Sequence, residues 1–262
     1  MKPHVLLCLF LIFARPSFAL ELKVMSFNLE SGDSDIAFLA NQIAEINEGT
    51  DVLAFQEVLP QWPEKIIAAV NSKRGGTYSY VLGRTGQGDR LLTVYNTNAL
   101  YLKDSYEIDH INIGGKVRAP LVTVFSSTED GKNFIVVNNH LYRSKNNIRH
   151  NQAKALNTWG QQQAHPIIAV GDYNFDWSIA GKYRDQGYDN FIANGVFQWI
   201  KPSTLVKTQC SKVYNAVLDF IFVGGGGKKI RGDSHILFPD PAYCIDNTIK
   251  SDHRPVTAWI QF

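Results

Sequence analysis

The sequence predicts a single α/β domain, and three observations support this prediction. Short runs rich in β-branched and aromatic residues alternate with amphipathic stretches throughout residues 20–262. No low-complexity linker divides this region into two parts. A chain of this length can also bury a substantial hydrophobic core without help from metals or cross-links. We therefore expect residues 20–262 to fold as one unit.

The first 19 residues have the composition of a secretory signal peptide. Lys2 provides a positively charged start, residues 5–13 form an unbroken apolar run, and small residues stand at positions 17 and 19. A membrane anchor is the alternative, but it needs about 20 apolar residues, and Arg15 interrupts the end of this run. We expect cleavage after Ala19 and a secreted or periplasmic protein without stable membrane insertion.

Removal of residues 1–19 would leave the protein close to neutral. Loss of Lys2 and Arg15 lowers the number of basic residues from 26 to 24, which equals the number of acidic residues, 24. A broad basic face normally supplies the salt-dependent part of nucleic-acid affinity. Any basic surface for nucleic acid on this protein must therefore be local.

Cysteine usage agrees with an oxidising compartment. Cys8 would leave with the signal peptide, and Cys210 and Cys244 would remain as a pair that we expect to form a disulfide. A zinc site is not indicated, because neither cysteine has a Cys-x-x-Cys partner or a nearby set of Cys and His residues.

The expected secondary structure follows from local residue patterns. The first expected helix carries Ile36, Leu39 and Ile43 at helical spacing, which predicts a stripe that faces a core. The expected helices are residues 35–46, 63–72 and 148–163. Eight strands are expected from their content of β-branched and aromatic residues. They are residues 22–28, 52–56, 91–95, 121–126, 134–140, 167–171, 218–223 and 256–261.

Two short motifs are interpreted as loops. The glycine-rich residues 224–229 lack the glycine spacing and the Ser or Thr of a phosphate-binding loop, so we expect a flexible loop. Arg231-Gly232-Asp233 matches an adhesion tripeptide, but three residues carry little information, and a turn is the simpler interpretation.

Polar clusters occur at the ends of several expected strands. They are Asn28-Leu29-Glu30, Gln56-Glu57, Asn138-Asn139-His140 and Asp172-Tyr173-Asn174, with Asp252-His253 before the last strand. Each cluster alone is compatible with a turn, because Asn, Asp and Gly favour turns. Catalytic groups are commonly held at strand ends by a rigid sheet. The repetition of the pattern therefore indicates a site.

These residue types suit the hydrolysis of phosphodiesters. The reaction needs a hard cation, carboxylates to hold it and a positioned base for water. Glu57 follows an apolar run and is a candidate ligand, since Mg²⁺ needs only one or two carboxylates. Asp172 and Asn174 are two residues apart and can leave an extended segment on one face. Asp219 lies inside an apolar run and needs a partner, for which His253 is a natural candidate.

The order of these motifs resembles the endonuclease/exonuclease/phosphatase superfamily, which includes deoxyribonuclease I. The motifs that carry the resemblance are Ser26-Phe27-Asn28, Gln56-Glu57, Arg118-Ala119-Pro120, Asn139-His140-Leu141, Gly171-Asp172-Tyr173-Asn174, Leu218-Asp219-Phe220-Ile221-Phe222 and Ser251-Asp252-His253-Arg254-Pro255-Val256. The resemblance covers essentially residues 22–262. The resemblance implies a four-layer α/β sandwich, in which two packed mixed β-sheets are flanked by helices and the site lies at one end between the sheets.

The resemblance also implies roles for individual residues. Those that correspond to the metal site are Asn28, Glu57 and Asp252. Those that correspond to catalytic groups are His140, Asp172, Asn174, Asp219 and His253. Arg118 corresponds to an arginine that contacts phosphate. The implied cation is Mg²⁺, with Mn²⁺ or Ca²⁺ as alternatives. The implied reaction is direct in-line attack of water on phosphorus, and the general base stays open between Asp172 and the His253–Asp219 pair.

The segment after His140 is a candidate for the local basic surface. Residues 143–150 are rich in Arg, Lys and His and lead into an expected helix, and an Arg and a Gln recur at similar spacing in the resembled family. We therefore expect Arg149 to bind substrate. A solvated helix start is an equally open alternative for any one of these residues.

One departure from the resembled nucleases concerns His140. Those enzymes usually carry a further acid that pairs with the corresponding histidine, and residues 86–90 offer only Asp89 as a weak match. The expected protein is a secreted, monomeric, metal-dependent phosphodiester hydrolase, foremost an endonuclease of DNA or RNA. A phospholipid, sphingomyelin or inositol-phosphate esterase and a catalytically inactive secreted binding module are the alternatives.

Overall fold

The computed structural model describes residues 19–115, 117–213, 215–225, 230–245 and 249–262. The predicted signal peptide lies outside the described residues except for Ala19, and so does most of the glycine-rich segment 224–229. In the part of the chain that is described, no helix is long and apolar enough to cross a membrane.

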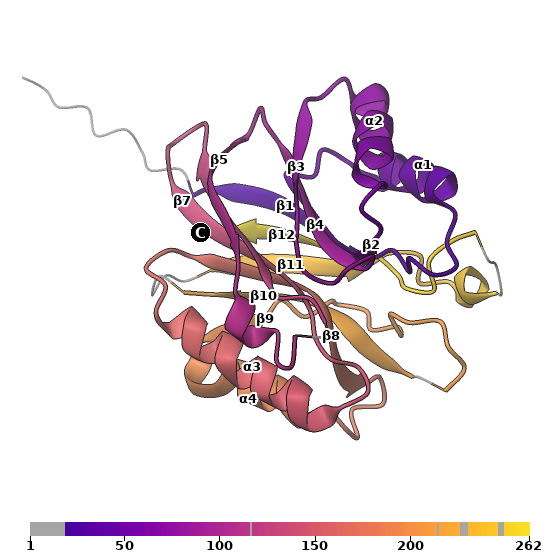
Figure 1. Cartoon of the computed structure of the whole chain (residues 1–262), viewed down its shortest axis with the longest axis vertical. Coiled ribbons are helices and arrows are strands. Elements are labelled where there is room, and N and C mark those ends of the chain that lie inside the picture. The colour runs from indigo at the N-terminus through magenta and orange to yellow at the C-terminus, as the bar shows by residue number, and fades with distance from the viewer. Residues whose placement is uncertain (1–18, 116, 214, 226–229, 246–248) are drawn as a thin grey trace, which may run out of the picture.

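Two six-stranded mixed β-sheets pack against each other, and helices lie on their outer sides (Figure 1). The first sheet has the order β11-β12-β1-β2-β4-β3 and the second the order β5-β6-β7-β8-β10-β9. Strands of the first sheet are β1 (Glu21–Asn28), β2 (Val52–Val58), β3 (Tyr78–Leu82), β4 (Arg90–Asn96), β11 (Arg231–Ile236) and β12 (Val256–Gln261). Strands of the second are β5 (Leu100–Glu107), β6 (Leu121–Ser127), β7 (Asn133–His140), β8 (Ile167–Ser178), β9 (Phe197–Trp199) and β10 (Ala216–Gly224).

In the described part of the chain, four α-helices complete the layers. They are α1 (Ile36–Ile46), α2 (Pro63–Arg74), α3 (Asn146–Gln161) and α4 (Gln186–Ile192). Single 3₁₀ turns occur at η1 (Asp109–Ile111), η2 (Ala193–Gly195) and η3 (Pro241–Cys244). Helices α1 and α2 lie beside the first sheet, and α3 and α4 beside the second (Figure 1). The predicted four-layer sandwich is therefore confirmed.

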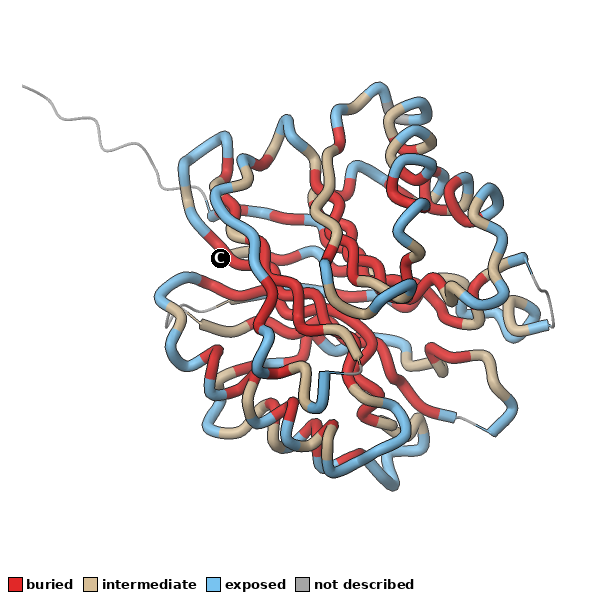
Figure 2. The backbone as a smooth tube through the Cα atoms, in the orientation of Figure 1, coloured by how far each residue is buried: buried red, intermediate tan, exposed pale blue. Residues whose placement is uncertain are grey.

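The core follows from the alternation of side chains along the central strands, which are buried on both faces (Figure 2). In β1, Val24 belongs to the large apolar cluster shared by both sheets, α3 and α4. Its neighbours Met25 and Phe27 belong to a second cluster, with Leu39 and Ile43 of α1. The stripe predicted for the first helix therefore faces this second cluster.

Two predictions about local structure need correction. Arg231-Gly232-Asp233 is not a turn, because it begins edge strand β11 and pairs with β12, with Gly232 opposite Ile260. A side chain at Gly232 would come within 2.7 Å of the carbonyl oxygen of Trp259, so the pairing needs glycine. The polar pair Asp172 and Asn174 does not follow its strand but lies inside it, because β8 continues to Ser178.

Parallel pairing at the middle of each sheet determines where the polar residues gather. Strands β1 and β2 run parallel with Asn28 opposite Gln56, and β7 and β8 run parallel with His140 opposite Asp172. The carboxyl ends of parallel neighbours lie at the same edge of a sheet. Both pairs therefore deliver their last polar residues to one end of the sandwich.

Candidate active site

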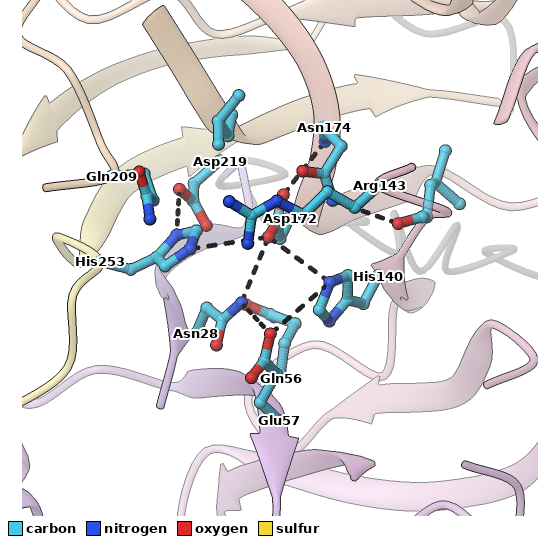
Figure 3. Close-up of polar contacts among 12 residues, drawn as sticks. Asn28, Gln56, Glu57, His140, Arg143, Asp172, Asn174, Gln209, Asp219 and His253 are labelled. Atoms are coloured by element: carbon cyan, nitrogen blue, oxygen red, sulfur yellow. Dashed lines mark hydrogen bonds and ion pairs between the residues drawn. The ribbon is translucent and has the colours of Figure 1, made fainter. Parts of the chain in front are cut away.

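Six of the predicted site residues form one hydrogen-bonded or ion-paired group between the two sheets (Figure 3). Asn28 and Glu57 come from the first sheet, His140, Asp172 and Asp219 come from the second, and His253 precedes β12. Asn174 is attached to the same group, because its backbone N–H donates to Oδ1 of Asp172 at 3.0 Å. Seven of the sequence-predicted residues are therefore brought together in space.

Asp172 lies at the centre of this group. Its Oδ2 is 3.2 Å from Nδ2 of Asn28, 3.5 Å from Nε2 of His140 and 3.8 Å from Nε2 of His253. Burial, followed by the negative charge of Asp219, raises the pKa of Asp172 to about 7. A carboxyl group with this pKa can both accept and release a proton near neutral pH.

Asp219 and His253 form a buried pair. Nδ1 of His253 is 2.8 Å from Oδ2 of Asp219, which directs the other ring nitrogen toward Asp172. Burial alone would lower the pKa of His253, but the charge and hydrogen bond of Asp219 raise it to about 10. The imidazole therefore carries a positive charge at neutral pH and can donate a hydrogen bond to an anion.

His140 has the opposite protonation state to His253. Burial, with the charge of Arg118 second, holds its pKa well below the usual value, so the ring is neutral. Its Nε2 faces Asp172 and, at 3.8 Å, Oε1 of Glu57. Its Nδ1 has no hydrogen-bond partner among the residues that the structure describes. Asp89 does not supply the missing acid, because it pairs with Arg118 instead.

A distorted strand directs Glu57 into the site. Consecutive side chains of a regular strand point to opposite faces, so Gln56 and Glu57 would normally diverge. The register of β2 against β4 shifts between Phe55 and Val58, and Glu57 has a φ of 55°. Such a bulge re-aims side chains. Gln56 can thus bond Asn138 of the second sheet at 2.8 Å while Glu57 accepts from Nδ2 of Asn28 at 3.1 Å.

Oxygen-rich side chains suited to a hard cation surround this group. The side chains of Glu57 and Asp252 are 28% and 33% exposed, so both can reach an ion that enters from solvent. Glu30 lies beside Asp252 and accepts its backbone N–H at 2.6 Å. Burial and the charge of Asp252 raise the pKa of Glu30 to about 7. The proximity of Glu30 and Asp252 fits a divalent cation, whose charge would relieve the repulsion between these two carboxylates.

A second compact group also offers ligand atoms. Asp172, Asp219 and His253 each place one such atom within 4.8 Å of the others. However, Nδ1 of His253 is already hydrogen-bonded to Asp219, and this pairing is the one expected of a proton-handling pair. Glu57, Asn28 and Asp252 therefore stay the predicted residues of a metal site.

The two predicted substrate arginines have different positions. Arg118 is 10% exposed and is held by Asp89. Burial lowers its pKa, and the charges of Glu57 and Asp172 oppose this effect, which places its guanidinium within their field.

Arg149 instead is buried, 2% exposed, and ion-paired with Asp185 at 2.7 Å. Its guanidinium also donates to the carbonyl oxygens of Tyr142 and Arg143 and to Oδ1 of Asn146. These bonds occupy its donors, so its geometry argues against the predicted contact with substrate.

Sequence reasoning missed two residues next to Asp252. Gln209 donates to Oδ2 of Asp252 at 2.5 Å, although no local motif marks it and 43 positions separate the two. Glu30 was visible as the last member of a polar cluster, but only the fold shows that it adjoins Asp252. The predicted disulfide between Cys210 and Cys244 is present, and it lies next to Gln209 in the chain.

Comparisons with known proteins agree with this geometry. The model of the Endonuclease/Exonuclease/phosphatase family matches residues 25–253. No curated protein shows significant sequence similarity. Among solved structures, an endonuclease/exonuclease/phosphatase from Bacteroides vulgatus is similar, with a TM-score of 0.72, 17% identity and coverage of 92% of this chain and 98% of that one.

Two further structures are similar in fold. TDP2 of D. rerio, complexed with a single-strand DNA product, has a TM-score of 0.71 and 17% identity, with 92% and 99% of the two chains covered. A mannosyl-6-phosphatase of Bacteroides thetaiotaomicron has a TM-score of 0.66 and 18% identity, with 92% and 100% covered. Since the family match covers most of the chain, the protein belongs to the endonuclease/exonuclease/phosphatase family, whose members are hydrolases of phosphoester bonds.

Proposed function

We propose that the protein is a secreted, divalent-metal-dependent phosphodiesterase, and that its substrate is DNA or RNA. The observation that carries the proposal is the arrangement around Asp172. A charged His253 and a neutral His140 both face this carboxyl group, whose own pKa is about 7. Three groups with different proton affinities at one point are typical of acid–base catalysis.

Each side chain has a defined task in this proposal. Glu57, Asn28 and Asp252 would hold a divalent cation, which would supply positive charge to the phosphate oxygens. His253, held by Asp219 at 2.8 Å, donates a hydrogen bond to a non-bridging oxygen. Arg118 provides a second positive charge from the side of Glu57.

Asp172 is the general base of the proposed reaction. Asn174 holds its Oδ1 through a backbone hydrogen bond, while Oδ2 faces Nε2 of both histidines. The water proton passes to Asp172 as the water oxygen bonds to phosphorus and the opposite P–O bond breaks. The leaving oxygen departs with the electron pair of that bond and takes a proton from solvent. His253 is protonated at neutral pH, so it suits the stabilisation of charge better than the removal of a proton.

A large groove beside the site favours a polymeric substrate over a small phosphoester. It has a volume of about 1120 Å³, and Glu30, Lys212, Lys250 and Asp252 contribute to its walls. A chain that passes over the candidate metal residues could continue into this groove. The similar TDP2 structure was solved with a single-strand DNA product, which supports the same substrate class. Secretion is supported by the predicted signal peptide and the disulfide.

Purified residues 20–262 with the disulfide formed would test this proposal. Plasmid DNA, RNA, sphingomyelin, an inositol phosphate and a sugar phosphate would each be incubated with Mg²⁺ or with EDTA. We expect cleavage of DNA or RNA that stops with EDTA, and a loss of at least about 100-fold in Asp172→Ala and His253→Ala. Turnover of only lipid or sugar phosphate would overturn the nuclease, and turnover in EDTA would overturn the metal.

A further inference from the structure

The segment between β7 and α3 is fixed by two buried side chains of α3. Nη1 of Arg149 donates to the carbonyl oxygen of Tyr142 at 2.9 Å and to that of Arg143 at 2.7 Å. Oε1 of Gln152 accepts the backbone N–H of Tyr142 at 2.9 Å. The main chain at Arg143 is therefore held on both sides, a few residues after His140.

Arg149 is itself anchored. Its Nη2 is 2.7 Å from Asp185, whose side chain is 1% exposed and also accepts the backbone N–H of Gly187 at the start of α4. A buried ion pair is favourable only with good geometry and additional hydrogen bonds, because both charges lose their hydration. Here these bonds go to the carbonyls before α3, so the pair fixes that segment rather than meeting a ligand.

Arg143, in contrast, is exposed and its side chain extends over the site. Figure 3 shows it reaching from the side of Asn174 in front of Asp172, toward His253. Its charge is one of the factors that lower the pKa of His140, after burial and the charges of Arg118 and His253. The guanidinium thus lies within electrostatic range of the centre of the site, on its solvent side.

A cation at this position has a specific use. The group around Asp172 contains three carboxylates, of Glu57, Asp172 and Asp219, and these repel a phosphate. The planar fork of a guanidinium matches two oxygens of a phosphate. We propose that Arg143 binds the phosphate of the substrate from the solvent side, and that Arg149 is the positioning residue that holds it there. The proposal rests on the proposed function, which supplies the phosphate.

Variants of the disulfide-bonded mature chain would test the inference, with a 5′-labelled 12-mer of single-stranded DNA and with bis(4-nitrophenyl) phosphate in Mg²⁺. We expect Arg143→Ala to lower kcat/KM by about 10- to 100-fold, mainly through KM, because a charged hydrogen bond to phosphate is lost. Its urea midpoint is measured alongside, so that a loss of substrate binding is separated from a loss of folding. Arg143→Lys should recover part of the loss.

The matched control is Arg231→Ala. Arg231 is also exposed, but it pairs with Gln261 at the end of the first sheet opposite to Asn28, so kcat and KM should stay at wild-type values. The role of Arg149 is tested by Arg149→Lys, alone and combined with Arg143→Ala. If Arg149 acts through Arg143, the substitution Arg149→Lys alone should raise KM. Combined with Arg143→Ala, it should not raise KM beyond the value of Arg143→Ala.

The outcomes separate this inference from the proposed function. Wild-type cleavage with an unchanged KM in Arg143→Ala overturns the inference and leaves the function intact. If the wild type cleaves neither probe, the proposed function fails, and fluorescence anisotropy with the same 12-mer decides about Arg143. Weaker binding by Arg143→Ala than by the wild type then supports the inference, and equal or absent binding overturns it.

Discussion

At the residue scale, the two histidines of the site differ because only one of them has an acid beside its Nδ1. Both are buried. Asp219 holds His253 in the charged state, whereas Nδ1 of His140 has no partner in the described part of the chain. One ring can therefore stabilise an anion while the other stays a neutral donor or acceptor. Opposite shifts of neighbouring groups are a common way for one site to serve both acid and base chemistry.

Asp219→Asn tests the origin of the charge on His253. Burial lowers the pKa of His253, and the variant removes the charge and hydrogen bond of Asp219 that outweigh it, so we expect this pKa to fall from about 10, with the charges of Asp172 and Asp252 still opposing the effect of burial. Histidine ¹³Cε1 shifts, recorded against pH in EDTA and assigned with His253→Ala, would measure the change. The pKa of His140 should rise in the variant, because the charge of His253 is one of the factors that lower it. A His253 pKa that stays near 10 in the variant would show that Asp219 is not its cause.

The same pair makes stability depend on pH. The pKa of His253 is higher in the folded protein than the ordinary 6.5. Its contribution to the free energy of unfolding is therefore complete below pH 6.5. That contribution is lost as the pH rises toward about 10. Urea unfolding of the wild type and of Asp219→Asn in EDTA should therefore show a difference that is largest near pH 6 and shrinks above it. A difference that grows with pH would contradict this assignment.

Sequence reasoning at this scale succeeds where a residue conflicts with its surroundings. Asp219 stands in a buried strand and needs a partner, and the predicted partner His253 is present. It fails for Arg149, because spacing along a helix places a residue near a site but does not tell whether its side chain points inward or outward. Gln209 could not be found, since only the folded chain brings it to Asp252.

At the element scale, the site depends on the close approach of β7 and β8. Gly171 has a φ of 140°, and an added methyl group would overlap the carbonyl oxygen of Asn139 on the neighbouring strand. This approach allows the next pair, His140 and Asp172, to lie opposite each other. The Gly in the Gly-Asp-x-Asn motif therefore has a steric function.

Gly171→Ala should consequently damage both stability and catalysis. We expect a loss of about 3 kcal/mol or more in the free energy of unfolding, since backbone would have to move in the core, and a fall in kcat beyond the fraction unfolded. Gly181→Ala is the control. Gly181 also has a positive φ, of 69°, but no atom lies within 4 Å of the added carbon, so only about 1 kcal/mol is expected. Equal losses in both variants would argue against the steric explanation.

The fold was predictable for its central elements and not for its edges. All eight expected strands and three expected helices are present, because buried strands have continuous apolar runs. The missed strands include β5, with exposed polar residues such as Lys103 and Asp104, and β9, which has only three residues. Both lie at the ends of the second sheet, where pairing on one side is enough and the residue pattern is weak.

At the scale of the whole molecule, the site connects the two sheets through hydrogen bonds. Asn28 and Gln56 of the first sheet bond Asp172 and Asn138 of the second at 3.2 and 2.8 Å. These polar contacts are buried, so they form only when the apolar cluster between the sheets has also formed. Catalytic geometry and global packing are thus coupled, and destabilising changes far from the site should lower the active fraction.

The disulfide couples a second part of the molecule to the site. Cys210 and Cys244 are 34 positions apart, and the backbone N–H of Cys210 donates to the carbonyl oxygen of Asp252 at 2.7 Å. Together with the bond from Gln209, this contact holds Asp252 at the groove. Loss of the cross-link should therefore affect the candidate metal residues as well as the stability of the protein.

Cys210→Ser/Cys244→Ser should lower the free energy of unfolding by roughly 3 to 4 kcal/mol, because a cross-link of this span restricts the unfolded chain. We also expect a higher Mg²⁺ concentration for half-maximal activity, since Asp252 loses part of its support. Urea unfolding and Mg²⁺ titration would measure both, with and without reductant. Reductant should change the wild type toward the variant and leave the variant unaffected. If reduction left the Mg²⁺ dependence of the wild type unchanged, the disulfide would only stabilise the fold. An oxidising compartment would then be needed for the stability of the protein but not for catalysis.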